Sequence, residues 1–251
     1  MTDIFDIAGR SILVAGGAGG IGSGIAMELA RRGAKLTIAD VDVSAASAAR
    51  DGLPGDGHAA CRLNVTDEDS CGAAVETAVA NGGRLDGMLN AAGILRVAPA
   101  IELPEADFKA SMDVNVTGSL LLARQAGKVM IVRGGGQIVT IASVSSIVAN
   151  PNYAAYATSK AALMQLTRVL AVEWAEHQVA VNAIGPAVIP TPLSDPFMEK
   201  PEFKAYQMSR IPMGRMATVE DLFGAALLLL SPAGAFMTGQ TLYVDGGRTL
   251  V

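Results

Sequence analysis

The stretch Ser11-Ile-Leu-Val-Ala15-Gly-Gly-Ala-Gly-Gly20-Ile-Gly22 decides the fold of this 251-residue chain. Its first five residues are a short, β-branched run typical of a buried strand, and the glycine-rich turn leads directly into a helical pattern over residues 21–32. Glycines let the backbone turn tightly and approach a pyrophosphate, whose charge is stabilised at a helix N-terminus. We therefore expect a dinucleotide-binding strand–turn–helix unit here.

Strand-like runs and helical patterns alternate along most of the chain. Strands are predicted at residues 11–15, 35–39, 59–63, 85–90, 137–142, 179–184 and 241–244, and helices at 21–32, 43–50, 67–80, about 105–132, 153–177 and 218–230. Such alternation implies right-handed crossovers and a parallel sheet. We expect an α/β fold in which residues 1–251 form one Rossmann-type domain, a doubly wound parallel sheet of about seven strands with helices on both faces.

Residues 187–216 interrupt this alternation, with five prolines and no sustained period. The stretch suggests a substrate lid with a short helix near residues 199–208. The side chains expected to line a substrate pocket come from the lid and from outside it: Phe197, Met198, Tyr206 and Met208 in the lid, and Arg96, Val144, Ser145, Asn150 and Tyr153 outside it. Arg96 would suit an anionic group, but an exposed loop arginine is more often an ordinary surface residue.

The composition limits the partners. A hydrophobic fraction of 51% with 28 glycines and 17% charged residues suits a sheet buried on both faces. The net charge of −5, without any basic run, argues against nucleic acid and anionic membranes as partners. The N-terminus lacks a secretory signal pattern and the longest aliphatic run, residues 225–230, is too short to cross a bilayer, so we expect a cytoplasmic protein.

The few cysteines and histidines do not suggest a metal site. Cys61 and Cys71 are not in a CxxC arrangement and read as buried thiols. Neither His58 nor His177 has a cysteine or second histidine at ligand spacing. We expect no bound metal.

Tyr156 and Lys160 stand four residues apart in a predicted helix, which places a phenol and an ammonium on one face. An ordinary phenol has a pKa near ~10, and a fixed cation beside it favours the phenolate. The pair alone would also suit the solvated side of an amphipathic helix. Ser143, 13 residues earlier, ends a predicted strand at the same edge of the sheet, where its hydroxyl can hydrogen-bond a substrate oxygen.

Asp40 follows the second predicted strand, where a carboxylate accepts both hydroxyls of a ribose. The same negative charge repels a 2′-phosphate, so the sequence favours NAD(H) over NADP(H). No basic residue lies within the glycine turn or at Val41, although Arg31 or Arg62 would weaken this preference if either reached the site.

Several ordered motifs combine with these features: Gly16-x-x-x-Gly20-x-Gly22, Asn90-Ala-Ala-Gly93, Asn115, Ser143, Tyr156-x-x-x-Lys160, Asn182-Ala-Ile-Gly-Pro186 and Val244-Asp-Gly-Gly. Over essentially its whole length, the chain resembles the short-chain dehydrogenase/reductase family. The resemblance implies that Tyr156 is the acid/base and that Lys160 lowers its pKa and binds the nicotinamide ribose. It further implies that Ser143 positions the substrate carbonyl and that Asn115 holds a water linking Lys160 to solvent. From its own sequence context, Asn115 equally suits a polar residue at a helix bend.

The resemblance also implies which residues bind the cofactor: Gly16, Gly19, Gly20, Ile21, Gly22, Asp40, Asn64, Val65, Asn90, Ala91, Gly93, Ile141, Tyr156, Lys160, Pro186, Val188 and Thr191. Asn64 stands where the family usually has Asp, and Ala187 where it usually has Gly. If the backbone at Ala187 required a positive φ, the substitution would cost about 1 kcal/mol of strain.

The expected activity is an NAD(H)-dependent interconversion of a secondary alcohol and a ketone, acting on a sugar, a polyol or a small cyclic compound. Two alternatives stay open: an NADPH-dependent 3-oxoacyl-carrier-protein reductase, and a non-catalytic nucleotide-binding regulatory protein. Two helical patterns are apolar on more than one face, at 120–132 and 161–172. This excess favours a subunit interface, and the resemblance implies a homotetramer.

Overall fold

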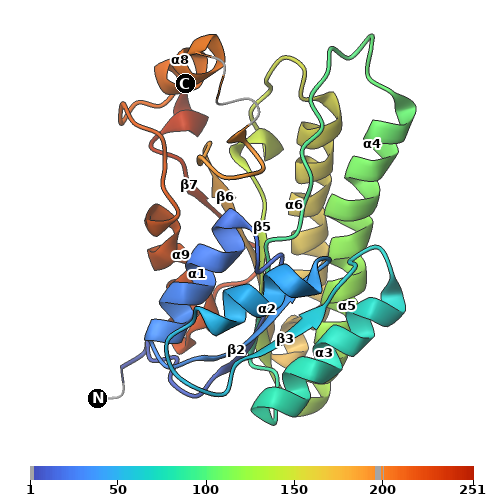
Figure 1. The fold of residues 1–251 in the computed structure, drawn as a ribbon, viewed down its shortest axis with the longest axis vertical. Helices are drawn as coiled ribbons and strands as arrows, with labels where there is room; N and C mark the ends of the chain where they lie inside the picture. Colours follow the sequence, from blue (N-terminus) through green and yellow to red (C-terminus); the bar gives the residue numbers. More distant parts are fainter. Residues whose placement is uncertain (1–2, 196–198, 200) are drawn as a thin grey trace.

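All seven strands join one parallel sheet in the computed structural model, which describes residues 3–195, 199 and 201–251 (Figure 1). The strand order is β3-β2-β1-β4-β5-β6-β7. The strands are β1 (Ser11–Ala15), β2 (Lys35–Asp40), β3 (Ala59–Arg62), β4 (Gly87–Asn90), β5 (Gly136–Ile141), β6 (Val179–Pro186) and β7 (Thr241–Val244). This arrangement confirms the predicted doubly wound α/β sheet.

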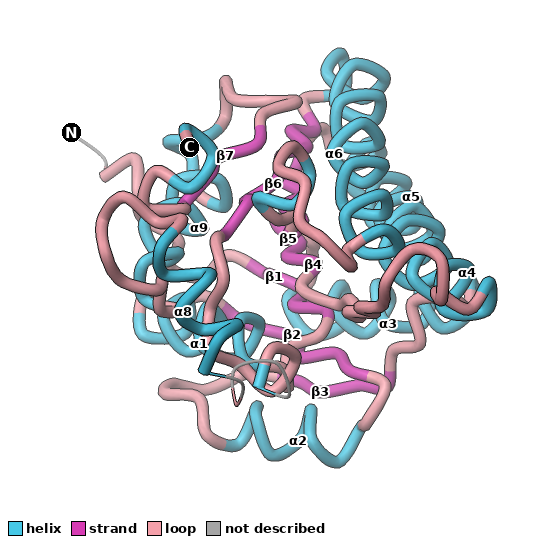
Figure 2. Tube along the Cα trace, turned by 90° about the horizontal axis from the view of Figure 1, so that it is seen from above, coloured by secondary structure: helices cyan, strands magenta, loops and turns pink. Residues whose placement is uncertain are grey.

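Helices cover both faces of the sheet, as the view along it shows (Figure 2). One face is covered by α1 (Gly20–Arg31), α2 (Val43–Asp51) and α9 (Phe223–Leu230). The other is covered by α3 (Glu68–Gly82), α5 (Gly118–Arg133) and α6 (Ala154–Trp174), with α4 (Glu105–Met112) leading into α5. Each face needs such a layer because the strands are apolar on both sides.

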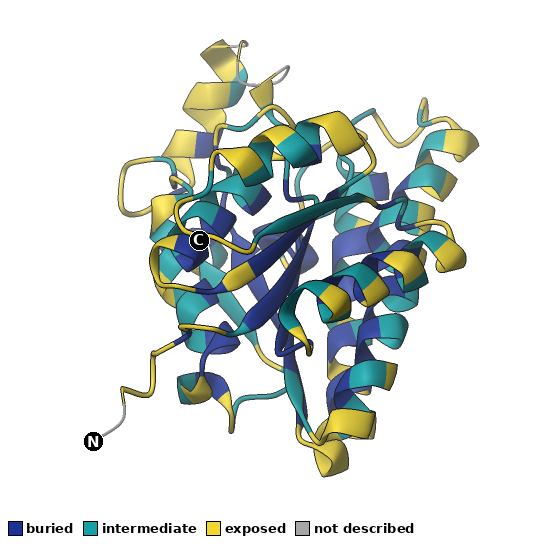
Figure 3. Ribbon diagram, turned by 60° about the horizontal axis from the view of Figure 1, so that its bottom comes forward, coloured by how far each residue is buried: buried dark blue, intermediate teal, exposed yellow. Residues whose placement is uncertain are grey.

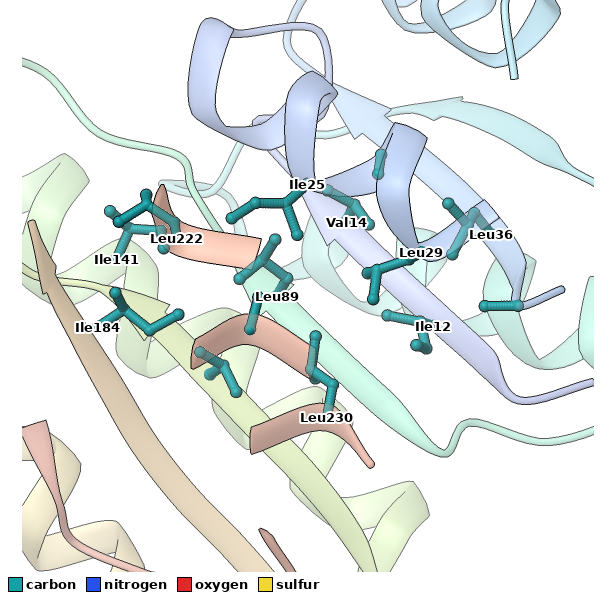
Figure 4. Close-up of a cluster of buried hydrophobic side chains, with 14 of the residues drawn as sticks. Ile12, Val14, Ile25, Leu29, Leu36, Leu89, Ile141, Ile184, Leu222 and Leu230 are labelled. Atoms are coloured by element: carbon teal, nitrogen blue, oxygen red, sulfur yellow. The ribbon is translucent and has the colours of Figure 1, made fainter. Parts of the chain in front are cut away.

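The hydrophobic core lies in two layers, one on each side of the sheet (Figure 3). In the first layer, Leu89 of β4 packs among side chains from α1 and α9, including Ile25 and Leu230 (Figure 4). All three of these side chains are almost completely buried. Close packing on both faces holds the strand ends in fixed positions.

The predicted helix at 105–132 is interrupted. Between α4 and α5, residues Asp113–Thr117 form a π-helical turn that contains the fully buried Asn115. The Asn115 amide hydrogen-bonds both the N–H and the carbonyl oxygen of Ile94, at 2.8 and 3.0 Å. The wider turn therefore allows a polar side chain to reach the loop after β4, and such π turns are frequent at functional sites.

Residues 187–216 do contain the short helix expected there, α8 (Pro201–Ser209). Figure 1 shows α8 beyond the carboxyl ends of the strands. This helix therefore lies over the edge of the sheet at which ligands bind in α/β folds.

The strand order reverses between β1 and β4, since β1, β2 and β3 progress in one direction while β4 to β7 progress in the other. At such a reversal the two neighbouring crossovers lie on opposite faces and leave a crevice at the carboxyl edge. The sheet topology thus identifies where a ligand site is expected.

Truncating Leu89 tests the core. Because Leu89 is fully buried, Leu89→Ala is expected to lower the free energy of unfolding by about 2–5 kcal/mol. Urea denaturation followed by circular dichroism measures this. The matched control is Leu250→Ala, whose side chain is 84% exposed, with an expected change within about 0.5 kcal/mol. Equal effects of the two changes would contradict this core assignment.

Candidate active site

A groove follows the carboxyl edge of the sheet on both sides of the reversal. Its first part, the nucleotide cleft, is lined by the glycine turn, the end of β2 and the segment after β4. Its second part, the catalytic pocket, lies between the ends of β5 and β6, the start of α6, and α8. The two parts are continuous, since both are lined by Ile21, Ala91, Gly93, Thr191 and Leu193.

The glycine turn has the geometry that a bound diphosphate requires. Gly16 has a φ of +67°, and a Cβ there would lie 2.6 Å from the backbone nitrogen of Ala92. At Gly22 an added Cβ would collide with the Gly16 carbonyl oxygen. Gly19 precedes α1 without a side-chain cap, so the first N–H groups of the helix remain available to an anion. These residues fit a dinucleotide cofactor.

Asp40 lies in the nucleotide cleft and also stabilises the glycine turn. Its Oδ2 accepts a hydrogen bond from the Ala18 N–H at 3.2 Å. Arg62 pairs with Asp40 across β2 and β3, so its side chain lies on the same face of the sheet at the outermost strand. Arg31, near the other end of α1, is 4.0 Å from Glu28. Of these two arginines, only Arg62 is a direct neighbour of Asp40 in the sheet.

Asn64 and Val65 line the nucleotide cleft, as expected. The Asn64 Oδ1 accepts hydrogen bonds from the N–H and the hydroxyl of Thr66, at 3.2 and 2.9 Å. The asparagine that replaces the family's usual aspartate therefore fixes the local turn.

Asn90 does not line the groove itself. It is buried, with its Oδ1 accepting from the Ala92 N–H and its Nδ2 donating to the Ser119 hydroxyl, at 3.1 and 2.9 Å. Ala91 and Gly93, by contrast, line both parts of the groove. Asn90 thus shapes the wall that its neighbours present.

The structure brings the four predicted catalytic residues together. Ser143 follows β5, and its hydroxyl lies close enough to the Tyr156 phenol to lower the pKa of that phenol. The Lys160 Nζ donates to the Ile141 carbonyl oxygen at 2.7 Å and lies 5.6 Å from the centre of the Tyr156 ring. Asn115 adjoins the same group, because Gly93 lies against both its Oδ1 and the Lys160 Nζ.

Burial dominates the acid–base properties of this group. It raises the pKa of Tyr156 to about 12, and the hydrogen bond with Ser143 offsets this only in part. Burial also lowers the pKa of Lys160 to about 8. The pKa of Tyr156 thus moves opposite to the direction expected from the sequence. The reason is that the phenol is desolvated while the Lys160 ammonium donates to Ile141 and faces the ring.

The chain after β6 closes one side of the groove. Pro186, Val188 and Thr191 line the catalytic pocket, and an added Cβ on Gly20 would lie 2.8 Å from the Thr191 methyl group. Ala187 does not have a positive φ, so the strain considered for it is not present.

The predicted substrate residues differ in whether they line a pocket. Ser145, Asn150 and Tyr153 line the catalytic pocket, as does Val144. Tyr206 lines only an adjoining outer pocket, which the catalytic pocket meets at Asn150, Tyr153, Phe203 and Gln207. Phe197 and Met198 lie outside the described residues, and Met208 is partly exposed and lines neither pocket.

Arg96 is not brought to the substrate site. Its Nε lies 3.3 Å from an Asp107 carboxylate oxygen, and its side chain is exposed. It lines neither the catalytic nor the outer pocket. The structure therefore favours the alternative that Arg96 is an ordinary surface residue.

Phe203 and Gln207 line the catalytic pocket and were missed as candidate residues. Their four-residue spacing within the predicted short helix places them on one helical face. That spacing was the available signal. It could not be used without knowing which face of α8 turns toward the strands.

Within residues 3–195, 199 and 201–251, no group of three or more His, Cys, Asp or Glu side chains is arranged to hold a metal ion. Over the same residues, no helix combines the length and apolarity needed to cross a membrane.

A titration of phenolate absorbance tests the buried state of Tyr156. With a pKa of about 12, this phenol stays protonated at alkaline pH while exposed phenols begin to ionise. The difference spectrum between wild type and Tyr156→Phe is therefore expected to show no phenolate up to about pH 9.5 in the free protein. A Tyr156 transition centred near neutral pH would contradict the assigned environment.

Comparison with known proteins gives the same picture over the whole chain. Residues 16–249 match the family model described as "Enoyl-(Acyl carrier protein) reductase". D-threitol dehydrogenase of Mycolicibacterium smegmatis is 37% identical over 248 residues, covering 98% of this chain and 95% of the relative. Gluconate 5-dehydrogenase of Gluconobacter oxydans is 35% identical, covering 99% and 98% of the two chains.

The fold matches solved structures equally closely. A gluconate 5-dehydrogenase from Burkholderia cenocepacia, in complex with NADP and tartrate, superimposes with a TM-score of 0.94 at 35% identity, over 99% of this chain and 98% of that one. Matches of this extent in both sequence and structure are decisive for family membership. The chain belongs to the short-chain dehydrogenase/reductase family.

Proposed function

We propose that the chain is an NAD(H)-dependent oxidoreductase that interconverts a secondary alcohol and a ketone of a sugar, a polyol or a small cyclic compound. The observation that carries this proposal is the placement of Ser143, Tyr156 and Lys160 around one pocket that is continuous with the nucleotide cleft. The relatives named above are a threitol and two gluconate dehydrogenases, which supports a hydroxylated substrate.

The proposed roles follow from the geometry. When bound, NAD⁺ supplies the hydride acceptor and adds positive charge to the site. Tyr156 accepts the hydroxyl proton of the substrate during oxidation and returns it during reduction. Ser143 hydrogen-bonds the same substrate oxygen, since its hydroxyl already contacts the phenol. The Lys160 ammonium provides a nearby positive charge that favours the phenolate.

Asn115 also stabilises this arrangement. Its amide holds Ile94, and its Nδ2 also donates to the Ser159 hydroxyl at 2.9 Å, which links the π turn to α6. We propose that it keeps the helix carrying Tyr156 and Lys160 in register with the strand ends, beside the water-holding role that the family resemblance implies.

We also propose that residues 1–251 work as one domain in which residues 187–216 form a lid over the substrate. Support comes from Val188 and Gln207, two residues of this segment that line the catalytic pocket. We further propose that the protein is a cytoplasmic homotetramer. Exposed apolar side chains on the outer faces of α5 and α6, Val132, Val169 and Val172, support a subunit interface there.

Removing the phenol oxygen tests the proposed chemistry. We expect Tyr156→Phe to lower kcat by about 10²–10⁴-fold on the best substrate from an NAD⁺ reduction screen of polyols, sugars, hydroxy acids and cyclic alcohols. Nucleotide affinity, measured by fluorescence titration, is expected to change little, because the glycine turn is unaffected. Undiminished turnover by this variant would rule out Tyr156 as the acid/base.

Cofactor choice is tested by titrating NADH and NADPH separately. The Asp40 carboxylate lies in the nucleotide cleft, so the wild type is expected to bind NADH at least about tenfold more tightly. Asp40→Ala is expected to reduce the ratio of NADH affinity to NADPH affinity. Adding Arg62→Ala to this variant is expected to restore part of the ratio if Arg62 assists the binding of a 2′-phosphate. A wild type that prefers NADPH would overturn the cofactor proposal without affecting the role of Tyr156.

A further inference from the structure

The catalytic pocket offers almost no charge to a substrate. Among the described residues that line it there is no Asp, Glu, Arg or His, and Lys160 is its single cation. Lys160 is only 4% exposed and its Nζ already donates to the Ile141 carbonyl oxygen. In the outer pocket, the described lining adds one charged residue, the acidic Glu202. A carboxylate entering from this side would meet a negative charge first.

In place of charge, the pocket has neutral side-chain groups that make no hydrogen bond with any described residue. The Gln207 side chain is only 8% exposed, yet its amide makes no hydrogen bond with the described part of the chain. It lines both the catalytic and the outer pocket. The amide has two donor hydrogens and an acceptor oxygen, and in the free protein these atoms are open to the pocket and are not sealed from water. Gln207 is therefore suited to pair with a ligand.

Asn150 extends this neutral surface at the junction of the two pockets. Its Oδ1 accepts a hydrogen bond from the Arg248 Nη2 at 3.0 Å, which leaves its Nδ2 as the free donor. Arg248 also donates to the Val251 carbonyl oxygen and lines neither pocket. Its charge thus orients Asn150 from behind.

We propose that the pocket selects a neutral polyhydroxylated substrate, an alditol or its ketose, over the corresponding carboxylate, with Gln207 as a specificity-determining residue. The inference rests on the proposed oxidoreductase function and assigns its substrate class. A hydroxyl finds free amide donors and acceptors beside the Ser143 and Tyr156 pair. Among the described lining residues, a carboxylate would find no side-chain cation except the buried Lys160 to replace its hydration. The relatives include both a threitol and a gluconate dehydrogenase, so the class is decided by this chain's own residues.

Matched substrates test the inference in the full-length wild type. Alditols of four to six carbons are compared with the aldonates that differ only in a terminal carboxylate, such as D-glucitol with D-gluconate, using either nucleotide. We expect kcat/KM for the best alditol to exceed that for its aldonate by at least about tenfold, because a polar site left unpaired rejects the wrong group.

Substitutions at Gln207 make the test specific to this residue. Gln207→Lys places a cation at the lining of the pocket. It is expected to shift the ratio of kcat/KM for the alditol to kcat/KM for the aldonate toward the aldonate by about tenfold or more. Gln207→Leu removes the hydrogen bonds at similar size and is expected to raise KM for the alditol more than it lowers kcat. Met208→Lys, which adds the same charge at a neighbouring position outside both pockets, should leave the ratio unchanged.

The outcomes separate the inference from the proposed function. A wild type that oxidises aldonates better than alditols, or cyclic alcohols but neither of these classes, overturns the inference and leaves the oxidoreductase function intact. A ratio that responds equally to Gln207→Lys and Met208→Lys overturns the role of Gln207. Failure to oxidise any alcohol with either nucleotide overturns the proposed function itself, and the inference with it.

Discussion

Because all seven strands run parallel, every connection must cross a face of the sheet, and every strand ends at the same edge. The reversal between β1 and β4 opens this edge into a crevice. The glycine turn after β1, Asp40 at the end of β2 and Ser143 after β5 therefore lie along one groove although they are far apart in the sequence. The site is a consequence of strand direction.

Lys160 connects this edge to the helix that carries the phenol. Its ammonium donates to the carbonyl oxygen of Ile141 at the end of β5, and its own carbonyl oxygen accepts from the Ser146 hydroxyl at 3.1 Å. Burying a cation in this way is unfavourable, as the lowered pKa of Lys160 shows. A buried charge with a perturbed pKa in a cleft is typical of a functional site. The position of Tyr156 thus depends on a residue that costs stability.

The sequence predicted those parts that depend on local pattern: the alternation of strands and helices, the glycine turn, and the Tyr156 and Lys160 spacing. It could not predict features that need the tertiary structure. The π turn at Asp113–Thr117 depends on contacts between Asn115 and a distant loop. The direction of the Tyr156 pKa depends on burial, and the place of Gln207 depends on how α8 covers the pocket. The periodicity of the sequence carries no information on these tertiary contacts.

The most direct measurement of the central claim is a crystal structure of the chain with NAD⁺ and an alditol. We expect the reacting hydroxyl oxygen to lie within about 3.2 Å of both the Tyr156 phenol oxygen and the Ser143 hydroxyl, with the nucleotide diphosphate at the glycine turn. An alditol bound in the catalytic pocket with its hydroxyls away from Tyr156 and Ser143, or a nucleotide bound elsewhere, would contradict it.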